Sequence, residues 1–328
     1  NLENFDKWSK DDNFIKDLIT MLDNVLQHYI DNAIDTTQLG EYSANFKRFQ
    51  KYVREGKEGF KARTQSSIAV SSNQEDWLLF NASPDILTQL KSAGLRLQPA
   101  NNVRDSGIKS IVLMDAQIDH TTGLFMLRES SSRLIIYSTK EVKEELTSGN
   151  PIFNVLDFYC KVDWVEIDLN EKGFVNVSKV KDIQLKFMPL KSEAPPFSPF
   201  RGKPRSGDNV GVQIIDAYTK KKIFYAPGLG SIEEHLFEPM KESDLLLVDG
   251  TFWTDTEMID NGLSKKLARE MGHNPQSGPG GMIEDLLRIS GPRKILIHIN
   301  NSNPILNENS PERAELVSNE IEVSYDGM

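Results

Sequence analysis

A short stretch from Asp115 to His120 places two carboxylates, an amide and an imidazole at alternating positions directly after an apolar run. The pair Asp119-His120 and a distant histidine, His298, can together offer one carboxylate and two imidazoles to a metal ion. Such a donor set leaves coordination positions open, and it suits iron(II) chemistry with dioxygen or a mononuclear zinc hydrolase. A helix-capping aspartate and a buried histidine explain the same residues without a metal. The spacing alone leaves both interpretations open.

Other polar residues follow apolar runs of strand length. Ser83, Asp249 and the segment from His298 to Asn301 each lie directly after such a run, and His273 lies in a glycine-containing loop. Strand ends are where a sheet scaffold displays reactive groups. We therefore expect these side chains to gather at one edge of the fold.

The pattern of apolar residues predicts ten strands with helices between several of them. The predicted strands are SSIAV, DWLLFNASPD, IKSIVLMD, RLIIYST, VDWVEID, IQLKFMPL, VGVQIIDA, KKIFYAPG, DLLLVDG and KILIHIN. The predicted helices are residues 13–34, 40–54, PDILTQLKSAG, STKEVKEELTSG, SIEEHLFEPMKES, SGPGGMIEDLLRIS and SPERAELVSNE. This order is typical of a layered α/β fold with sheets inside and helices outside. Residues 191–209, rich in Pro, Ser and basic residues, are predicted to form a lid or binding loop.

Composition narrows the class of protein. The net charge of -10 argues against broad contact with nucleic acid, which needs a basic face. The longest apolar runs have strand length, which predicts no membrane span, and no signal peptide opens the chain. The single cysteine, Cys160, excludes an intrachain disulfide and a cysteine-built zinc cluster, and its apolar surroundings predict a buried structural thiol. These features predict a cytoplasmic location.

Longer motifs reveal a family resemblance. DAQIDHTTGL resembles the HxHxDH metal motif of the metallo-β-lactamase superfamily. From Tyr52 to Met328 the chain resembles the coenzyme PQQ biosynthesis protein B family through many motifs in order, among them LFNASPDI, APPFSP, FYAPGLG, LLVDGT, REMGH and IHINNSNPILNENSPER. The resemblance implies a four-layer αββα sandwich over residues 51–328, preceded by an atypical helical segment over residues 1–50.

The resemblance also implies that one of the superfamily's two metal positions is lost. Asp115 and Gln117 replace the two histidines of HxH, and the loop of residues 191–209 contains no histidine. Pro227 and Gly228 lie where the superfamily carries its bridging aspartate. The ligands of the second metal remain, namely Asp119, His120 and His298.

The family is associated with iron-dependent oxygenation. The resemblance therefore implies bound Fe(II), with zinc as a metal found after purification, and dioxygen as co-substrate. It implies hydroxylation of the tyrosine ring of a Glu–Tyr species cut from the precursor peptide PqqA. Other PQQ biosynthesis proteins are expected partners.

Supporting roles are assigned within the same resemblance. Asp115, Gln117 and Asp249 are expected beside the metal, where the two aspartates orient ligands or simply cap strand ends. His273 is expected to carry a proton. Residues expected to bind substrate, or else to be solvated loop and turn residues, are Arg63, Ser83, Arg201, Lys203, Arg205, Asn300 and Asn301.

The first fifty residues depart from the family, whose members open with a strand, a glycine-rich loop and a short cysteine cluster. Here a predicted helix over residues 13–34 and a phenylalanine-containing stretch up to Gln50 take that place. We expect this segment to cover the sheet edge, bind a partner or form a homodimer. Two alternatives to the hydroxylase follow from the sequence, a mononuclear zinc hydrolase and a non-enzymatic carrier of PQQ or its intermediate.

Overall fold

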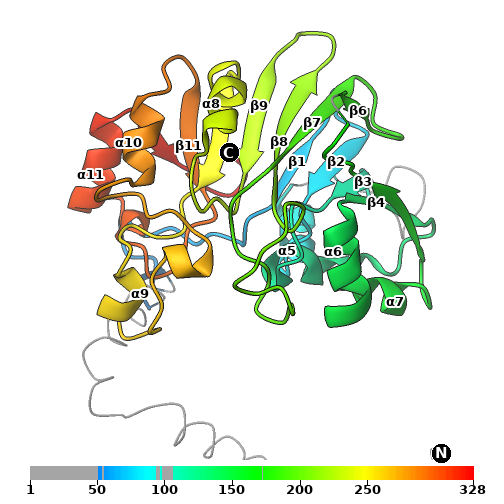
Figure 1. Cartoon of the computed structure of the whole chain (residues 1–328), viewed down its shortest axis with the longest axis horizontal. Coiled ribbons are helices and arrows are strands. Elements are labelled where there is room, and N and C mark those ends of the chain that lie inside the picture. Colours follow the sequence, from blue (N-terminus) through cyan, green and yellow to red (C-terminus); the bar gives the residue numbers. More distant parts are fainter. Residues whose placement is uncertain (1–50, 54, 94–96, 98–105, 172) are drawn as a thin grey trace, which may run out of the picture.

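Two β-sheets packed face to face form the centre of the computed structural model, which describes residues 51–53, 55–93, 97, 106–171 and 173–328. The predicted helix over residues 13–34 lies outside these residues, and of the predicted helix over residues 40–54 only the helical residues 51–53 are described. Helices cover the outer face of each sheet, so the layers follow the order αββα (Figure 1). This confirms the expected four-layer sandwich. No helix in the described ranges is long and apolar enough to cross a bilayer.

The first sheet has five strands in the order β1-β2-β3-β4-β5. A hairpin joins β1 to β2 in antiparallel register, and the other neighbours are parallel. Helix α4 (Ile86–Ser92) follows β2, α5 (Ile118–Thr121) follows β3, and α6 (Lys140–Glu144) and α7 (Ile152–Leu156) follow β4. The strands are β1 (Ile68–Val70), β2 (Trp77–Phe80), β3 (Ile108–Val112), β4 (Leu134–Ser138) and β5 (Val162–Glu166).

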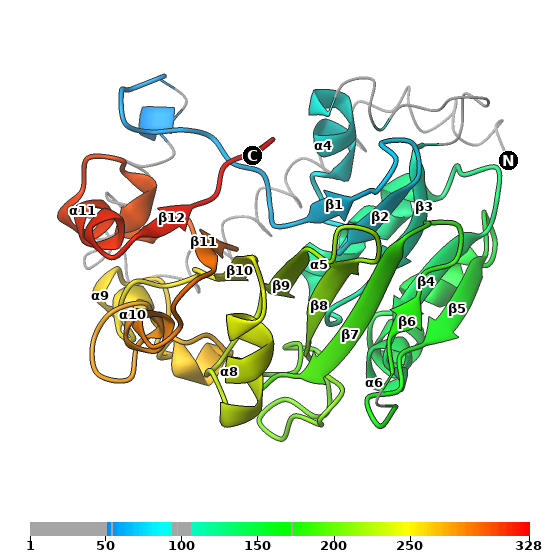
Figure 2. The same ribbon diagram turned by 90° about the horizontal axis from the view of Figure 1, so that it is seen from above.

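The second sheet has seven strands in the order β12-β11-β10-β9-β8-β7-β6, antiparallel from β6 to β9 and parallel from β9 to β12. Its strands are β6 (Val175–Asn176), β7 (Ile183–Pro189), β8 (Val210–Asp216), β9 (Lys222–Ala226), β10 (Leu245–Asp249), β11 (Arg293–Ile297) and β12 (Ile321–Val323). Its helices are α8 (Glu234–Lys241), α9 (Glu257–Asp260), α10 (Met282–Leu287) and α11 (Pro311–Ser318). Figure 2 shows the first sheet lying against β7 and β8 of the second sheet.

Alternating side chains explain why both sheets are covered on both faces. Phe80 and Tyr225 point between the sheets and meet edge-on at 5.7 Å, whereas their neighbours Leu79 and Phe224 point outward to the helices. A strand whose two faces are both apolar is stable only between two layers. Cys160 is buried in the outer core of the first sheet, as its surroundings predicted.

All ten predicted strands are present, but the sequence pattern missed several short elements, among them β6, β12, α5, α7 and α9. Strands β6 and β12 have two and three residues, too few for a visible alternation. Helix α7 forms within a run that reads only as apolar and aromatic. The predicted helix from Ser138 continues beyond α6 as a π-helical turn, Glu145–Gly149.

Candidate metal centre

The carboxyl ends of three strands carry the residues with metal-binding chemistry. Strand β3 leads into the loop with Asp115 and into α5, which carries Asp119 and His120. Strands β10 and β11 are parallel neighbours, with Asp249 paired to Ile297 just before His298. The sheet register therefore places Asp249 and His298 side by side, as expected from their positions after strands.

Asp119, His120 and His298 converge on one point. The Nε2 atom of His298 lies 3.1 Å from Oδ2 of Asp119, and Nε2 of His120 lies 3.7 Å from the same oxygen. The donor atoms of the three residues all lie within 4.8 Å of one another, although α5 and β11 are far apart in the sequence. His298 adopts φ 55°, a left-handed conformation that is uncommon outside glycine and typical of functional sites.

Asp115 fixes the orientation of His120. Both carboxylate oxygens of Asp115 lie 2.8 Å from Nδ1 of His120. A carboxylate only accepts, so Nδ1 carries a hydrogen, and in the neutral ring the lone pair is on Nε2, the atom that would bind a metal. Among the described residues this buried Nε2 atom has no hydrogen-bond partner. A buried imidazole nitrogen without a partner is costly unless a metal ion completes it.

The negative charges around His120 favour a positive charge at this place, either a proton on the ring or a bound metal ion. Burial lowers the pKa of His120, but the charges of Asp115 and Asp119 outweigh burial and raise this pKa to about 9. Burial alone would raise the pKa of Asp119, yet the charge of His120 and the hydrogen bond from His298 hold it well below its usual range. Two imidazoles and one carboxylate suit iron(II) or zinc. These three residues therefore fit a metal ion.

A second group, Asp249, His273 and His298, has donor atoms equally close together but no free acceptor on its carboxylate. Asp249 accepts from the Thr251 amide at 2.9 Å and hydroxyl at 2.5 Å through Oδ1, and from the Leu229 amide at 3.0 Å and His273 Nδ1 at 2.5 Å through Oδ2. These four bonds use the full acceptor capacity of a carboxylate. Asp249 is placed to orient its neighbours rather than to bind metal.

His273 lies beside the metal centre. Its ring stacks on that of His298, with centroids 5.4 Å apart and planes at 19°. Burial lowers the pKa of His273, but the charge and hydrogen bond of Asp249 outweigh burial and raise it. Nδ1 donates to Asp249, so Nε2 is the atom left to exchange a proton.

The family resemblance predicts Pro227 and Gly228 at the place of the superfamily's bridging aspartate. A Cβ atom built on Gly228 would lie 3.9 Å from Oδ2 of Asp115, with no closer contact. Asp115 itself is bonded to His120, and the side chain of Gln117 donates to the carbonyl of Glu193 at 3.4 Å. The side chains of Asp115 and Gln117 thus have partners within the chain, and Gly228 has no side chain that could serve as a metal ligand beside them.

Most of the residues expected to bind substrate have partners within the chain. Arg63 donates to the carbonyl of Ser324 at 2.8 Å, and Ser83 donates to Gln89 at 2.9 Å. Asn300 donates to the hydroxyl of Ser302 at 2.5 Å, while Asn301 is exposed.

The two arginines of the proline-rich loop differ in their surroundings. Arg205 is paired with Asp208 at 2.8 Å and with Glu144 at 2.5 Å, so its guanidinium anchors the loop to α6. Arg201 donates to the carbonyl of Ala194 at 2.5 Å and to that of Glu270 at 3.3 Å. Arg201 thereby ties this loop to the turn that precedes His273.

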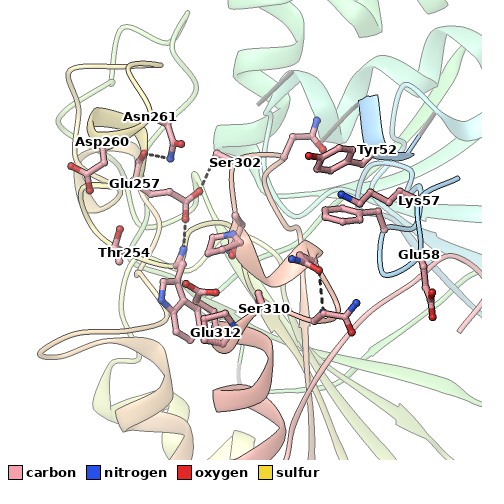
Figure 3. A pocket seen from close by; sticks show the side chains of 18 residues that line it. Tyr52, Lys57, Glu58, Thr254, Glu257, Asp260, Asn261, Ser302, Ser310 and Glu312 are labelled. Atoms are coloured by element: carbon pink, nitrogen blue, oxygen red, sulfur yellow. Dashed lines mark hydrogen bonds between the residues drawn. The ribbon is translucent and has the colours of Figure 1, made fainter. Parts of the chain in front are cut away.

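A cavity of about 780 Å³ is lined in part by Asn301, Ser302 and Asn303, in the loop that follows His298 (Figure 3). The side chain of Glu257 forms part of the cavity wall, where it accepts hydrogen bonds from the Trp253 amide at 2.6 Å and from the Ser302 hydroxyl at 2.5 Å. Trp253 lies in the loop that carries Thr251, and Ser302 lies in the loop that carries His298. Glu257 therefore connects the two loops that carry these residues. Burial raises the pKa of Glu257 to about 7, against the effect of its hydrogen bonds.

Glu257 is expected to make stability depend on pH. Its pKa in the folded chain is about 7 against 4.5 when unperturbed, so between these values the folded chain keeps a proton that the unfolded chain has lost. Protonated Glu257 therefore adds up to about 3 kcal/mol to the free energy of unfolding. This stabilisation is fully present below pH 4.5 and is lost as the pH rises through 7. Denaturant unfolding at pH 5 and pH 8 should show this loss in the wild type and not in Glu257→Gln. The exposed Glu238→Gln is the matched control. A difference between wild type and Glu257→Gln that stays constant with pH would contradict the assignment.

Comparison with known proteins first defines the class. The model of the beta-lactamase superfamily domain matches residues 76–299, in agreement with the αββα layers and the ligands at strand ends. More particularly, the chain belongs to the coenzyme PQQ synthesis protein B family. It is 54% identical over 276 residues to the member from Methylobacillus flagellatus, covering 84% of this chain and 90% of the relative. It is 53% identical over 277 residues to the member from Azoarcus sp., with the same coverage.

A solved structure shares the fold over most of both chains. The crystal structure of Zn(2+)-bound PqqB from Methylobacterium extorquens matches with a TM-score of 0.75 and 30% identity, covering 85% of this chain and 91% of that one. That relative binds zinc, one of the two metals that the donor set of this chain suits.

Proposed function

We propose that this chain acts in PQQ biosynthesis as an iron(II)-dependent, oxygen-using hydroxylase of the tyrosine ring in a Glu–Tyr molecule derived from PqqA. Membership of the PQQ synthesis protein B family supports the pathway. The observation that carries the chemistry is the convergence of Asp119, His298 and the partnerless Nε2 of His120 on one point. A two-histidine, one-carboxylate set with open positions is typical of non-haem iron(II) oxygenases.

The side chains around this point have distinct tasks in the proposal. Asp119, His120 and His298 hold the metal, and Asp115 keeps His120 oriented. Iron(II), when bound, supplies the activation of dioxygen beside the substrate ring. His273 exchanges a proton at Nε2 with the reacting molecule, since Asp249 holds its Nδ1 atom.

Arg201 is proposed to bind a substrate carboxylate. It lies in the loop that also receives the side chain of Gln117, and its Nε is only loosely paired with Glu193, at 3.9 Å. An incoming carboxylate can replace so long an ion pair with a bidentate one. Arg205 is less suited, because two internal carboxylates already pair with it.

The test is a reaction of the iron-loaded full chain with Glu–Tyr, ascorbate as reductant and ¹⁸O₂. We expect a ring-hydroxylated product that carries one ¹⁸O atom, detected by mass spectrometry. The zinc-loaded chain is the control and should give none, because zinc has no redox chemistry. Absence of product from chain with one iron bound would contradict the proposed reaction.

A one-zinc hydrolase is the second candidate, favoured by the zinc in the Methylobacterium extorquens relative. Hydrolysis of a phosphodiester or ester by the zinc form, absent in the iron form, would support it. Tight binding of PQQ by metal-free chain, with no turnover in either form, would instead indicate a carrier.

A further inference from the structure

Thr251 lies two residues after β10, and its buried hydroxyl is at the junction of two histidines and a carboxylate. Its Oγ1 atom lies 2.5 Å from Oδ1 of Asp249, 2.7 Å from Nδ1 of His298, 2.9 Å from the carbonyl oxygen of His298 and 3.1 Å from Nδ1 of His273. The sequence predicted a role for Asp249 but none for Thr251. Thr251 belongs to the DGT motif, but the two histidines that it contacts, His273 and His298, lie 22 and 47 positions away in the sequence.

Counting hydrogens fixes the direction of these bonds. A hydroxyl has one hydrogen to donate, whereas the Asp249 carboxylate and the His298 carbonyl can only accept. Oδ1 of Asp249 lies only 2.5 Å from the hydroxyl oxygen, and so short a contact with an atom that only accepts requires the Thr251 hydrogen. The contact with Nδ1 of His298, at 2.7 Å, must then be a bond that His298 donates. His298 is consequently protonated at Nδ1, and Nε2 is the ring atom that faces Asp119 at 3.1 Å, where a metal ion would take the place of the hydrogen between them.

We propose that Thr251 is a positioning residue that holds His298 in the tautomer and ring orientation required to bind a metal. This inference rests on the metal centre of the proposed function. It gives both ligand histidines the same support by different means, because Asp115 accepts directly from His120 while Asp249 acts on His298 through Thr251. A second bond, which the Thr251 amide donates to Asp249 at 2.9 Å, fixes the hydroxyl in place.

Thr251 also stabilises the backbone of the loop that carries His298. His298 has a positive φ, and the Thr251 hydroxyl contacts its backbone carbonyl as well as its ring. The amide of Asn300 donates to the carbonyl of Thr251 at 3.1 Å. One residue thus holds both the ring and the backbone of a metal ligand. Groups that hold a ligand from outside the metal's own shell typically change metal affinity 10–100-fold when they are removed.

The test compares Thr251→Val, which keeps the shape and removes the hydroxyl, with Thr251→Ser, which keeps the hydroxyl. Zn(II) affinity of the full chain is measured by competition with a chromophoric chelator, beside wild type and His298→Ala. We expect Thr251→Val to bind zinc about 10–100-fold more weakly, and Thr251→Ser to stay within about threefold of wild type.

The outcomes separate the inference from the metal centre itself. Equal affinity of wild type and His298→Ala would overturn the metal centre. The role of Thr251 alone would be overturned if wild type binds zinc tightly, His298→Ala does not, and Thr251→Val binds zinc as tightly as wild type does. A lower melting temperature of Thr251→Val with unchanged zinc affinity would likewise reduce Thr251 to a structural residue.

A spectroscopic readout tests the tautomer directly. The chain has five histidines, so ¹⁵N-histidine labelling with single His→Gln variants assigns each ring. In the zinc-loaded wild type and in Thr251→Ser, His298 should show a protonated Nδ1. A mixture of tautomers or loss of the metal-bound signal is expected in metal-titrated Thr251→Val. An unchanged Nδ1–H signal in that variant would contradict the proposal.

Discussion

His298→Ala is expected to lose specific binding of one Fe(II) or Zn(II) per chain. The metal centre has three protein donors, and removal of His298 leaves only Asp119 and His120, whose nearest donor atoms are 3.7 Å apart. Replacing a group that merely orients a ligand already costs about 10–100-fold in affinity, so loss of the ligand itself should exceed 100-fold. Anaerobic Fe(II) titration with equilibrium dialysis measures the effect.

His235→Ala is the matched control for this experiment. His235 lies exposed on α8, where it contacts the carbonyl of Pro189 at 3.0 Å, and its loss should leave metal binding unchanged. Circular dichroism shows whether both variants remain folded. If folded His298→Ala binds iron as tightly as wild type does, the three residues are not the metal site, and the hydroxylase proposal fails with them.

Gly123→Ala is expected to destabilise the fold strongly. Gly123 follows α5, and a Cβ atom there would lie 2.2 Å from the carbonyl oxygen of Ser83 and 2.7 Å from that of Ala82. The amide of Gly123 also donates to the Ala82 carbonyl at 2.8 Å, and the amide of Ala82 donates to that of His120 at 2.7 Å. These backbone atoms cannot move without separating α5 from the end of β2. We expect a loss of about 3 kcal/mol or more in the free energy of unfolding.

Gly173→Ala provides the comparison. No atom of the described residues lies within 4 Å of a Cβ atom built on Gly173, so this change should alter stability by less than about 1 kcal/mol. Urea denaturation of both variants and the wild type measures the difference. Metal affinity of Gly123→Ala should fall as well, because the contact that forbids a side chain also positions His120. Equal stability of the two variants would show that the loop after β2 yields easily.

The expected loss in Gly123→Ala also explains part of the motif in which the metal ligands lie. Thr121 and Thr122 donate their hydroxyls to the carbonyls of Gln117 and Ile118, one turn earlier, and Gly123 then lets the chain pass against the first sheet. The short α5 is thus held at both ends by contacts of its own motif. This rigid placement is what a metal ligand on a four-residue helix requires.

The sequence by itself determined the elements that local patterns encode. Runs such as Ile111–Met114 and Leu245–Val248 predicted strands, because alternation and apolar content act within a few residues. The resemblance of the motifs to a known family also predicted the αββα layers and the ligands Asp119, His120 and His298. The sequence did not decide between a metal and a capped helix end without that resemblance.

Only the tertiary structure decided which side chains are partners. Arg205 is paired with Glu144, 61 positions away, and Thr251 contacts His298, 47 positions away. The same proline-rich loop holds Arg201, whose guanidinium faces the turn before His273. A hydrogen bond depends on distances of a few tenths of an ångström between atoms, and these are set by how the two sheets and their loops pack together. No window of the sequence contains both partners of such a bond, which is why the support of His298 by Thr251 and Asp249 is visible only in the folded chain.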